Sequence, residues 1–279
     1  MNTVNSDAKT VESFGDEWTR FDQSGLGDDE LRAIFSDYFR IFPWEALPPR
    51  PVGFDMGCGS GRWAKFVLPR VGRLTCVDAS EAAIKVARGS LAGFDNAAFL
   101  VSEANATPIE KASQDFGYSL GVLHHIPDTA SALSACVELL KPGAPFLVYL
   151  YYAFDNRPLW FRALWRASDL LRGVISRLPP ALKRGVTDAI AALAYWPLAR
   201  LCALGEKLGL NMSGVPLYYY RHSSFYTMRT DSRDRFGTPL ERRFTRSDIQ
   251  QMMEHAGLER VSFSDQQPYW CAVGFRAAS

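Results

Sequence analysis

A short apolar stretch that runs into three alternate glycines constrains the fold of this chain more than any other feature. Residues 52–56 read as a buried strand that contains Asp55, and Gly57, Gly59 and Gly61 follow it. Because glycine lacks a Cβ atom, a ligand can approach such a turn closely. The turn would also open a helix whose N–H groups face that ligand. The pattern predicts a strand–turn–helix unit with a ligand at the turn.

The glycine spacing separates the classes of nucleotide-binding turn. A dinucleotide fingerprint needs G-x-G-x-x-G, whereas this chain has G-x-G-x-G, with the third glycine one position early. A phosphate-binding P-loop is excluded because the chain contains no G-x-x-x-x-G-K-[ST]. A second carboxylate, Asp78, ends the next apolar run, residues 73–77.

The D-x-G-x-G-x-G turn with its following acid resembles motif I of the class I S-adenosylmethionine (SAM)-dependent methyltransferases. Further blocks resemble the small-molecule (type 11-like) branch of this family in the same order. They are residues 99–109, 115–128, 139–143 and 145–152. The chain departs from the family pattern at Glu103, where Asp is usual, and at Ala144, where a second glycine is usual.

This resemblance implies SAM as cofactor and S-adenosylhomocysteine as product. It implies that the glycines pass beneath the methionine part of SAM, that Asp78 binds the ribose hydroxyls and that Glu103 lies at the adenine. The expected cofactor-binding residues are Asp55, Gly57, Cys58, Gly59, Gly61, Asp78, Ala79, Glu103, Ala104, Ser119, Leu120 and Trp18.

The order of elements predicts an α/β fold. Residues 50–152 alternate strand and helix five times, which favours a Rossmann-like doubly wound, mostly parallel sheet with helices on both faces. Ser80, Asp128 and Thr245 are placed to cap helices. The last two strands, residues 260–264 and 269–275, read as an antiparallel hairpin at the sheet edge.

We divide the chain into a tail and cap at residues 1–48 and a methyltransferase domain at residues 49–279, with a helical insert at about 153–244. The first 12 residues are polar and predicted to be disordered. Phe14 and Trp18 of the cap either contact SAM or its acceptor, or pack on the core.

The insert is the least generic segment, so we expect it to choose the acceptor. Its first half predicts an amphipathic helix that ends at Pro179-Pro180. A second, apolar helix is predicted from Val186 to about Leu208, with a kink at Trp196-Pro197. Nine basic and four acidic residues lie between 155 and 207. Two interpretations of the insert stay open. It binds a membrane surface or an apolar acceptor, which a Trp160/Trp165 double variant would test, or it forms a lid with a solvated basic face.

Residues 217–236 are rich in tyrosine and arginine. Tyrosine rings can form the flat walls of a binding pocket, and arginine side chains can bind a carboxylate or a phosphate. We expect them either to line the acceptor pocket or to form a surface loop with internal Arg–Asp pairs. The expected acceptor contacts are Tyr219, Arg221, Tyr226 and Arg229.

Methyl transfer from a sulfonium is an in-line displacement at carbon, and the enzyme mainly aligns the reactants. An oxygen acceptor must also lose a proton, for which histidine is the natural base. The candidates are His124, His125 and His222, and the alternative role for the adjacent pair is to anchor the turn beside SAM. No cluster of His, Cys, Asp and Glu residues has the spacing of metal ligands in the sequence, so we expect no bound metal.

The composition of the chain restricts the classes of binding partner that we expect. The net charge of +1 provides no field that would recruit nucleic acid, and the five cysteines are scattered without C-x-x-C, as in a cytoplasmic protein. The leading interpretation is methyl transfer to an O or N atom of a small molecule. The alternatives are a membrane-surface enzyme with a lipid or quinone-like acceptor, and a SAM-binding domain without catalysis. The oligomeric state stays open.

Overall fold

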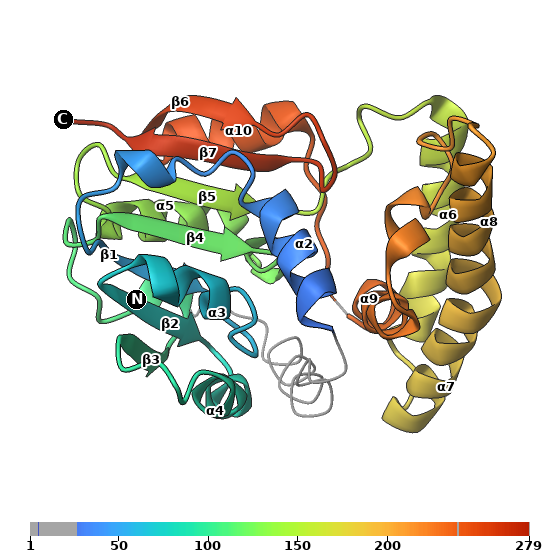
Figure 1. Cartoon of the computed structure of the whole chain (residues 1–279), viewed down its shortest axis with the longest axis horizontal. Coiled ribbons are helices and arrows are strands. Elements are labelled where there is room, and N and C mark those ends of the chain that lie inside the picture. The colour runs from blue at the N-terminus through green and yellow to red at the C-terminus, as the bar shows by residue number, and fades with distance from the viewer. Residues whose placement is uncertain (1–4, 6–26, 239, 279) are drawn as a thin grey trace. The chain divides into compact units, whose positions relative to one another are not determined.

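The computed structural model describes residue 5, residues 27–238 and residues 240–278 (Figure 1). The chain divides into two compact units. Leu31–Ala153 and Leu240–Ser279 belong to the first unit, and Gly25–Glu30 and Phe154–Pro239 belong to the second. Phe14, Trp18 and, apart from Asn5, the polar first 12 residues lie outside the described residues, so the predictions made for them stay predictions.

A seven-stranded sheet forms the centre of the first unit, in the order β3-β2-β1-β4-β5-β7-β6. Its strands are β1 (Val52–Met56), β2 (Arg73–Asp78), β3 (Ala97–Val101), β4 (Phe116–Leu120), β5 (Pro145–Tyr149), β6 (Leu258–Phe263) and β7 (Cys271–Arg276). Strands β1 to β5 run parallel, and β7 is antiparallel to both β5 and β6. The predicted Rossmann-like sheet with an antiparallel C-terminal hairpin is confirmed.

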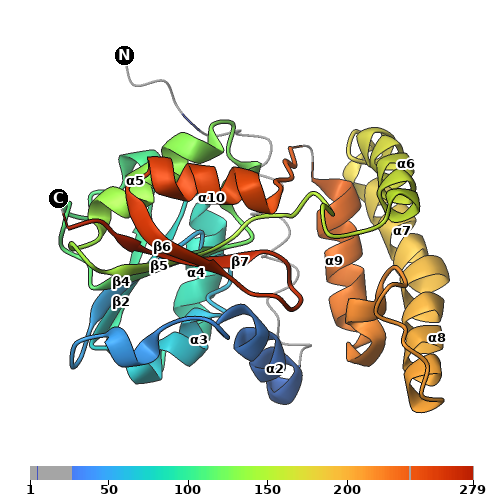
Figure 2. The same ribbon diagram turned by 90° about the horizontal axis from the view of Figure 1, so that it is seen from above.

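The helices assigned to this unit are α3 (Ala64–Val67), α4 (Glu81–Ser90), α5 (Thr129–Leu139) and α10 (Arg246–His255). Helix α2 (Asp28–Tyr38) belongs to this unit from Leu31 onward. Figure 2 shows α5 and α10 on one face of the sheet and α3 on the other. The three predicted caps are confirmed, because the side chains of Ser80, Asp128 and Thr245 accept N–H groups in the first turns of α4, α5 and α10.

The sheet reverses its strand order at β1, which lies between β2 and β4. Such a switch point leaves a crevice beyond the carboxyl ends of the strands, where doubly wound folds bind ligands. The glycine turn follows β1 directly, and Asp78 is the last residue of β2. The topology therefore brings the two predicted acidic positions and the glycines to one edge of the sheet.

The second unit is helical. It contains α6 (Leu159–Ile175), α7 (Pro180–Ile190), α8 (Trp196–Lys207) and α9 (Phe225–Gly237). Pro179-Pro180 separates α6 from α7 as predicted, and a π-helical turn, Ala191–Tyr195, precedes the expected kink at Pro197. Proline cannot donate an N–H, which favours such a local change of hydrogen bonding.

Residues 217–236 form a 3₁₀ helix, Tyr218–His222, followed by α9, so the surface loop that was one alternative for them is wrong. The core of this unit consists of Ile175, Tyr195, Ala199, Met228 and Phe236. Among the described helices, none combines the length and the apolar character needed to cross a bilayer.

Candidate functional site

The glycine turn is held against the end of β2. The N–H of Gly57 donates to the carbonyl oxygen of Val77 at 2.7 Å. The φ angles of Gly57, Gly59 and Gly61 are 82°, 53° and 79°, in the left-handed region that side chains disfavour. A Cβ atom on Gly57 would also lie 2.4 Å from the methyl groups of Val122. Both the backbone conformation and the close packing therefore require glycine at this turn.

The carboxylate of Asp78 is fixed beside the turn by two backbone groups. Its Oδ2 accepts the N–H of Gly59 and its Oδ1 accepts the N–H of Ser80, each at 2.9 Å. Burial raises the pKa of Asp78, and these two hydrogen bonds oppose that rise. Each carboxylate oxygen has more than one lone pair, so the held carboxylate can still accept hydrogen bonds from a ligand.

Asp55 and Ser119 turn their side chains into the protein. The hydroxyl of Tyr118 donates to the Asp55 carboxylate at 2.9 Å, and Asp55 is 1% exposed. Burial raises the pKa of Asp55 to about 8 in spite of that hydrogen bond. The Ser119 hydroxyl donates to the carbonyl oxygen of Met56 at 2.8 Å and is fully buried. Both side chains fasten the end of β1 to β4.

The other predicted cofactor residues in the described part of the chain lie along the same edge. Glu103 is half-buried and precedes the 3₁₀ turn Ala104–Ala106 after β3. The N–H of Ser102 donates to the carbonyl oxygen of Asp78 at 2.9 Å, which ties the ends of β2 and β3 together. Of the remaining predicted residues, Ala79 is half-buried and Cys58, Ala104 and Leu120 are buried. Trp18 lies outside the described residues.

The predicted histidine pair forms a 3₁₀ turn, Leu123–His125, after β4. The ring of His124 stacks on Tyr151 with a centroid distance of 3.9 Å, and neither of its nitrogens has a hydrogen-bond partner among the described residues. Burial, together with His125 and Arg243, holds the pKa of His124 well below its usual range. His124 is therefore neutral near pH 7.

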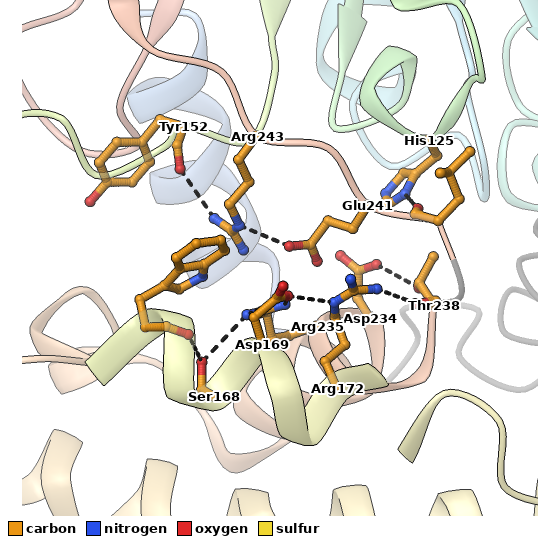
Figure 3. A network of polar contacts seen from close by, with 12 residues as sticks. His125, Tyr152, Ser168, Asp169, Arg172, Asp234, Arg235, Thr238, Glu241 and Arg243 are labelled. Carbon is orange, nitrogen blue, oxygen red and sulfur yellow. Dashed lines mark hydrogen bonds and ion pairs between the residues drawn. The ribbon is translucent and has the colours of Figure 1, made fainter. Parts of the chain in front are cut away.

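The second histidine of the pair has a defined tautomer. Nδ1 of His125 lies 2.7 Å from the carbonyl oxygen of Leu240 (Figure 3). Because a carbonyl oxygen can only accept, Nδ1 carries a proton, and in the neutral ring Nε2 therefore carries the lone pair. A neutral imidazole in this tautomer is oriented to take up a proton at Nε2.

Arg243 and Glu241 join this histidine turn and were not predicted. The segment that carries them runs beside residues 151–153, because the N–H of Phe244 donates to the carbonyl oxygen of Tyr151 at 2.9 Å. Arg243 pairs with Glu241 at 2.8 Å and donates to the carbonyl oxygen of Tyr152 at 3.3 Å (Figure 3). Burial opposes the charge of Arg243, but Glu241, Tyr151 and Tyr149 together outweigh this effect and raise the pKa of the guanidinium.

The predicted acceptor contacts belong to the second unit. Arg221 forms an ion pair with Glu206 at 3.0 Å, and Nε2 of His222 lies 2.8 Å from the same carboxylate. The His222 side chain is 65% exposed. Tyr219 belongs to the 3₁₀ helix of this unit, and Tyr226 and Arg229 belong to α9.

Comparisons with known proteins agree with this geometry. A family model described as a methyltransferase domain matches residues 54–148. The chain is 34% identical over 189 residues to the ubiquinone biosynthesis O-methyltransferase of Alkalilimnicola ehrlichii, which covers 61% of this chain and 72% of that protein. It is 30% identical over 175 residues to the Aromatoleum aromaticum protein of the same name, over 59% of this chain and 69% of that protein.

This chain belongs to the class I SAM-dependent methyltransferases.

The matched residues of this methyltransferase run from β1 to β5 and contain the glycine turn, Asp78 and Glu103. Its fold is similar to that of a Thermotoga maritima protein described as a SAM-dependent methyltransferase, with a TM-score of 0.51 and 14% identity over 95% of this chain and 100% of that chain. At this identity the similarity concerns the fold alone. The methyltransferase spans about 70% of the two relatives described above.

Proposed function

We propose that this methyltransferase transfers the methyl group of SAM to an oxygen atom of a small-molecule acceptor and releases S-adenosylhomocysteine. The observation that carries the proposal is the Asp78 carboxylate, held by the N–H groups of Gly59 and Ser80 beside the left-handed glycine turn. The two relatives named as O-methyltransferases support oxygen as the atom that receives the methyl group.

Asp78 would bind the ribose of SAM in this proposal. Two vicinal hydroxyls are donors, and a carboxylate whose orientation is already fixed loses little freedom when it accepts them. Glu103 stands in the position proposed for the adenine, at the end of the neighbouring strand β3. The glycine turn would receive the methionine part of SAM, because it offers backbone without side chains.

His125 would take the proton of the acceptor hydroxyl. The hydrogen bond from Nδ1 to Leu240 leaves the lone pair on Nε2. His124 is the weaker base, because burial depresses its pKa. Arg243 and Tyr151 would then position the turn, since Tyr151 stacks on His124 and the Arg243 guanidinium lies 5.0 Å from the Tyr151 ring. His222, which pairs with Glu206 in the second unit, stays a lower-ranked candidate.

A second acceptor class, a lipid or a quinone-like ring with an apolar tail, is favoured by the names of the relatives and by the exposed apolar side chains of the second unit. Tyr219, Arg221, Tyr226 and Arg229 remain the proposed acceptor contacts. Arg221 is the weakest of them, because its guanidinium already pairs with the Glu206 carboxylate.

Methyl-labelled SAM and an extract of the source cells test the proposal. The purified protein is incubated with both, and the products are separated into aqueous, organic and precipitated macromolecular fractions. Label in the aqueous or organic fraction, in a product whose new bond mass spectrometry assigns to oxygen, supports the proposal. Label on nitrogen, or only in the precipitate, contradicts it. The organic fraction specifically supports the lipid-like or quinone-like class.

A further inference from the structure

Helix α6 presents its apolar side to solvent. Successive residues of a helix are about 100° apart, and at this spacing all exposed positions of α6 fall on one side. These positions are Leu159, Trp160, Ala163, Leu164, Arg166, Ala167, Leu170, Leu171 and Val174. Leu159 and Leu170 are 79% and 78% exposed. Arg166 is the single charged residue of this side.

The inward side of α6 holds most of the polar side chains of the helix, beside the partly buried Phe161 and Trp165 and the buried Ile175. Asp169 forms ion pairs with Arg172 of the same helix at 2.7 Å and with Arg235 of α9 at 3.3 Å (Figure 3). Arg172 also donates to the carbonyl oxygen of Thr238 at 3.2 Å. A surface helix of a globular protein normally buries its apolar side and exposes its polar side. Helix α6 departs from this arrangement, because most of its apolar side chains are exposed and most of its polar ones face inward.

The next two helices continue this pattern. The exposed residues from α7 to α8 are Pro180, Ala181, Leu182, Gly185, Ala189, Ala192, Leu193, Trp196, Pro197, Leu198, Leu201, Leu204 and Lys207. Among the large hydrophobic side chains that are exposed in the described chain, only Val101 lies in the first unit. We call the exposed sides of α6, α7 and α8 together the α6–α8 face.

The charges on the α6–α8 face have one sign. Between residues 159 and 207, the exposed charged residues are Arg166, Arg177 and Lys207, and no uncharged polar side chain is exposed. The acids of this range, Asp169, Asp188 and Glu206, are only partly exposed. Residues 154–239 contain 13 Lys and Arg and 6 Asp and Glu, a formal charge of +7, whereas the whole chain carries +1.

We propose that the α6–α8 face docks on the surface of a lipid bilayer that contains anionic lipids. Exposed leucines and Trp160 would enter the boundary between headgroups and acyl chains, where amphipathic helices and tryptophan are stabilised. Arg166, Arg177 and Lys207 would contact lipid phosphates, since basic side chains near an anionic leaflet are attracted to it. The three acids between residues 159 and 207 are less exposed than these basic residues, which matches an anionic partner.

A second copy of the chain fits this face less well. A symmetric dimer uses the same patch on both subunits. Arg166, Arg177 and Lys207 would then meet their own equivalents, and Asp169 and Glu206, which are partly exposed in the same range, are already paired with arginines of the second unit. The docking proposal concerns the second unit alone and does not depend on the acceptor of the proposed function.

Vesicle flotation with the full chain tests the proposal. The protein is mixed with vesicles of phosphatidylcholine alone, or with vesicles in which part of that lipid is replaced by phosphatidylglycerol. We expect flotation with the anionic vesicles that weakens as salt is added, because salt screens exposed charges. The Leu170→Ser/Leu171→Ser variant should partition roughly tenfold more weakly or worse, since it removes two large exposed apolar side chains.

Matched control variants distinguish docking through this face from nonspecific adsorption to vesicles and from misfolding. Val101→Ser removes an exposed apolar side chain of β3, and Lys85→Glu reverses an exposed charge of α4, and both should float like the wild type. Arg166→Glu/Lys207→Glu should lose the preference for anionic vesicles while circular dichroism stays unchanged. Absent flotation of the wild type, or unchanged flotation of both double variants, overturns the proposal. A dimer that Leu170→Ser/Leu171→Ser dissociates, without vesicle binding, assigns the face to a second copy instead.

Discussion

The backbone N–H of Gly59 donates a 2.9 Å hydrogen bond to the carboxylate of Asp78, and so the turn after β1 and the end of β2 are one structural unit. This bond makes the glycine turn and the acid interdependent. A substitution at Asp78 should therefore change both the affinity for SAM and the order of the turn, whereas an acid that acted on the ligand alone would change only the affinity.

Asp78→Ala should weaken SAM binding by at least roughly ten- to hundredfold, because even one of the two proposed charge-assisted hydrogen bonds to the ribose hydroxyls contributes about 1.5–3 kcal/mol. It should also lower the free energy of unfolding of the ligand-free protein by about 1–3 kcal/mol, since the N–H groups of Gly59 and Ser80 lose their acceptor. Titration calorimetry and thermal unfolding measure the two effects. Asp95→Asn, at an exposed acid after α4, is the control and should change neither. Unchanged SAM affinity in Asp78→Ala would refute the assignment of the site.

Gly57→Ala should destabilise the protein by about 2–4 kcal/mol. The left-handed φ of 82° opposes any Cβ atom, and the added methyl would meet Val122 at 2.4 Å. Urea unfolding of the ligand-free protein measures this loss. Val122→Ala removes the two methyl groups at 2.4 Å but leaves the Cβ atom of residue 122 at 2.8 Å and the backbone strain. We therefore expect Gly57→Ala to destabilise the Val122→Ala background by less than it destabilises the wild type. Strict additivity would show that the contact contributes nothing.

Asp55 should make the stability of the ligand-free protein depend on pH in a defined direction. Burial raises the pKa of Asp55 from 3.8 to about 8. Between these two values the folded protein holds a proton that the unfolded chain has released. Stability therefore falls as the pH rises through this window and levels off above it. Asp55→Asn removes the titration and can still accept the Tyr118 hydroxyl.

We expect the free energy of unfolding of Asp55→Asn to depend less on pH between about pH 4 and pH 8 than that of the wild type. At pH 8 the variant should be the more stable of the two proteins, by a few kcal/mol. Denaturant unfolding at a series of pH values measures the slopes. The opposite slope in the wild type, with stability gained as the pH rises, would mean that Asp55 is ionised in the folded state and that a cation near the turn holds it so.

The sheet could be predicted because its signals are local. Helix caps at Ser80 and Asp128 and the glycine turn each specify their conformation within a few residues, and the alternation of strand and helix then predicts a mostly parallel sheet. The meeting of Asp78 and the glycine turn followed from that topology. The contact between Arg243 and the histidine turn did not, because residues 240–244 and residues 151–153 are about 90 positions apart and carry no shared motif.

The orientation of α6 could not be predicted from its periodicity. The pattern shows that the helix has an apolar and a polar side, but the choice of the inward side depends on the pairing of Asp169 with Arg235, 66 positions away. Trp160 and Trp165 do not lie on the same side of this helix. Five residues along a helix correspond to about 140°, and Trp165 lies inward with the Arg235 guanidinium 5.4 Å from its ring.

The two adjacent histidines should respond differently to substitution. His125→Asn removes the proposed base and should lower kcat by roughly 10²–10⁴-fold while SAM affinity stays the same. Its residual activity should rise with pH if the acceptor is a phenol, because the hydroxyl, with a pKa of about 10, then ionises without help. The acceptor for this assay is the one identified with labelled SAM.

His124→Phe is the matched comparison. It keeps a ring against Tyr151 and removes two buried nitrogens that have no hydrogen-bond partner among the described residues. Because each such nitrogen costs about 1–3 kcal/mol, the variant should unfold at the same or a higher temperature than the wild type. Its kcat should fall less than that of His125→Asn. If the two variants lose kcat equally and neither profile shifts with pH, the pair anchors the turn and neither histidine is the base.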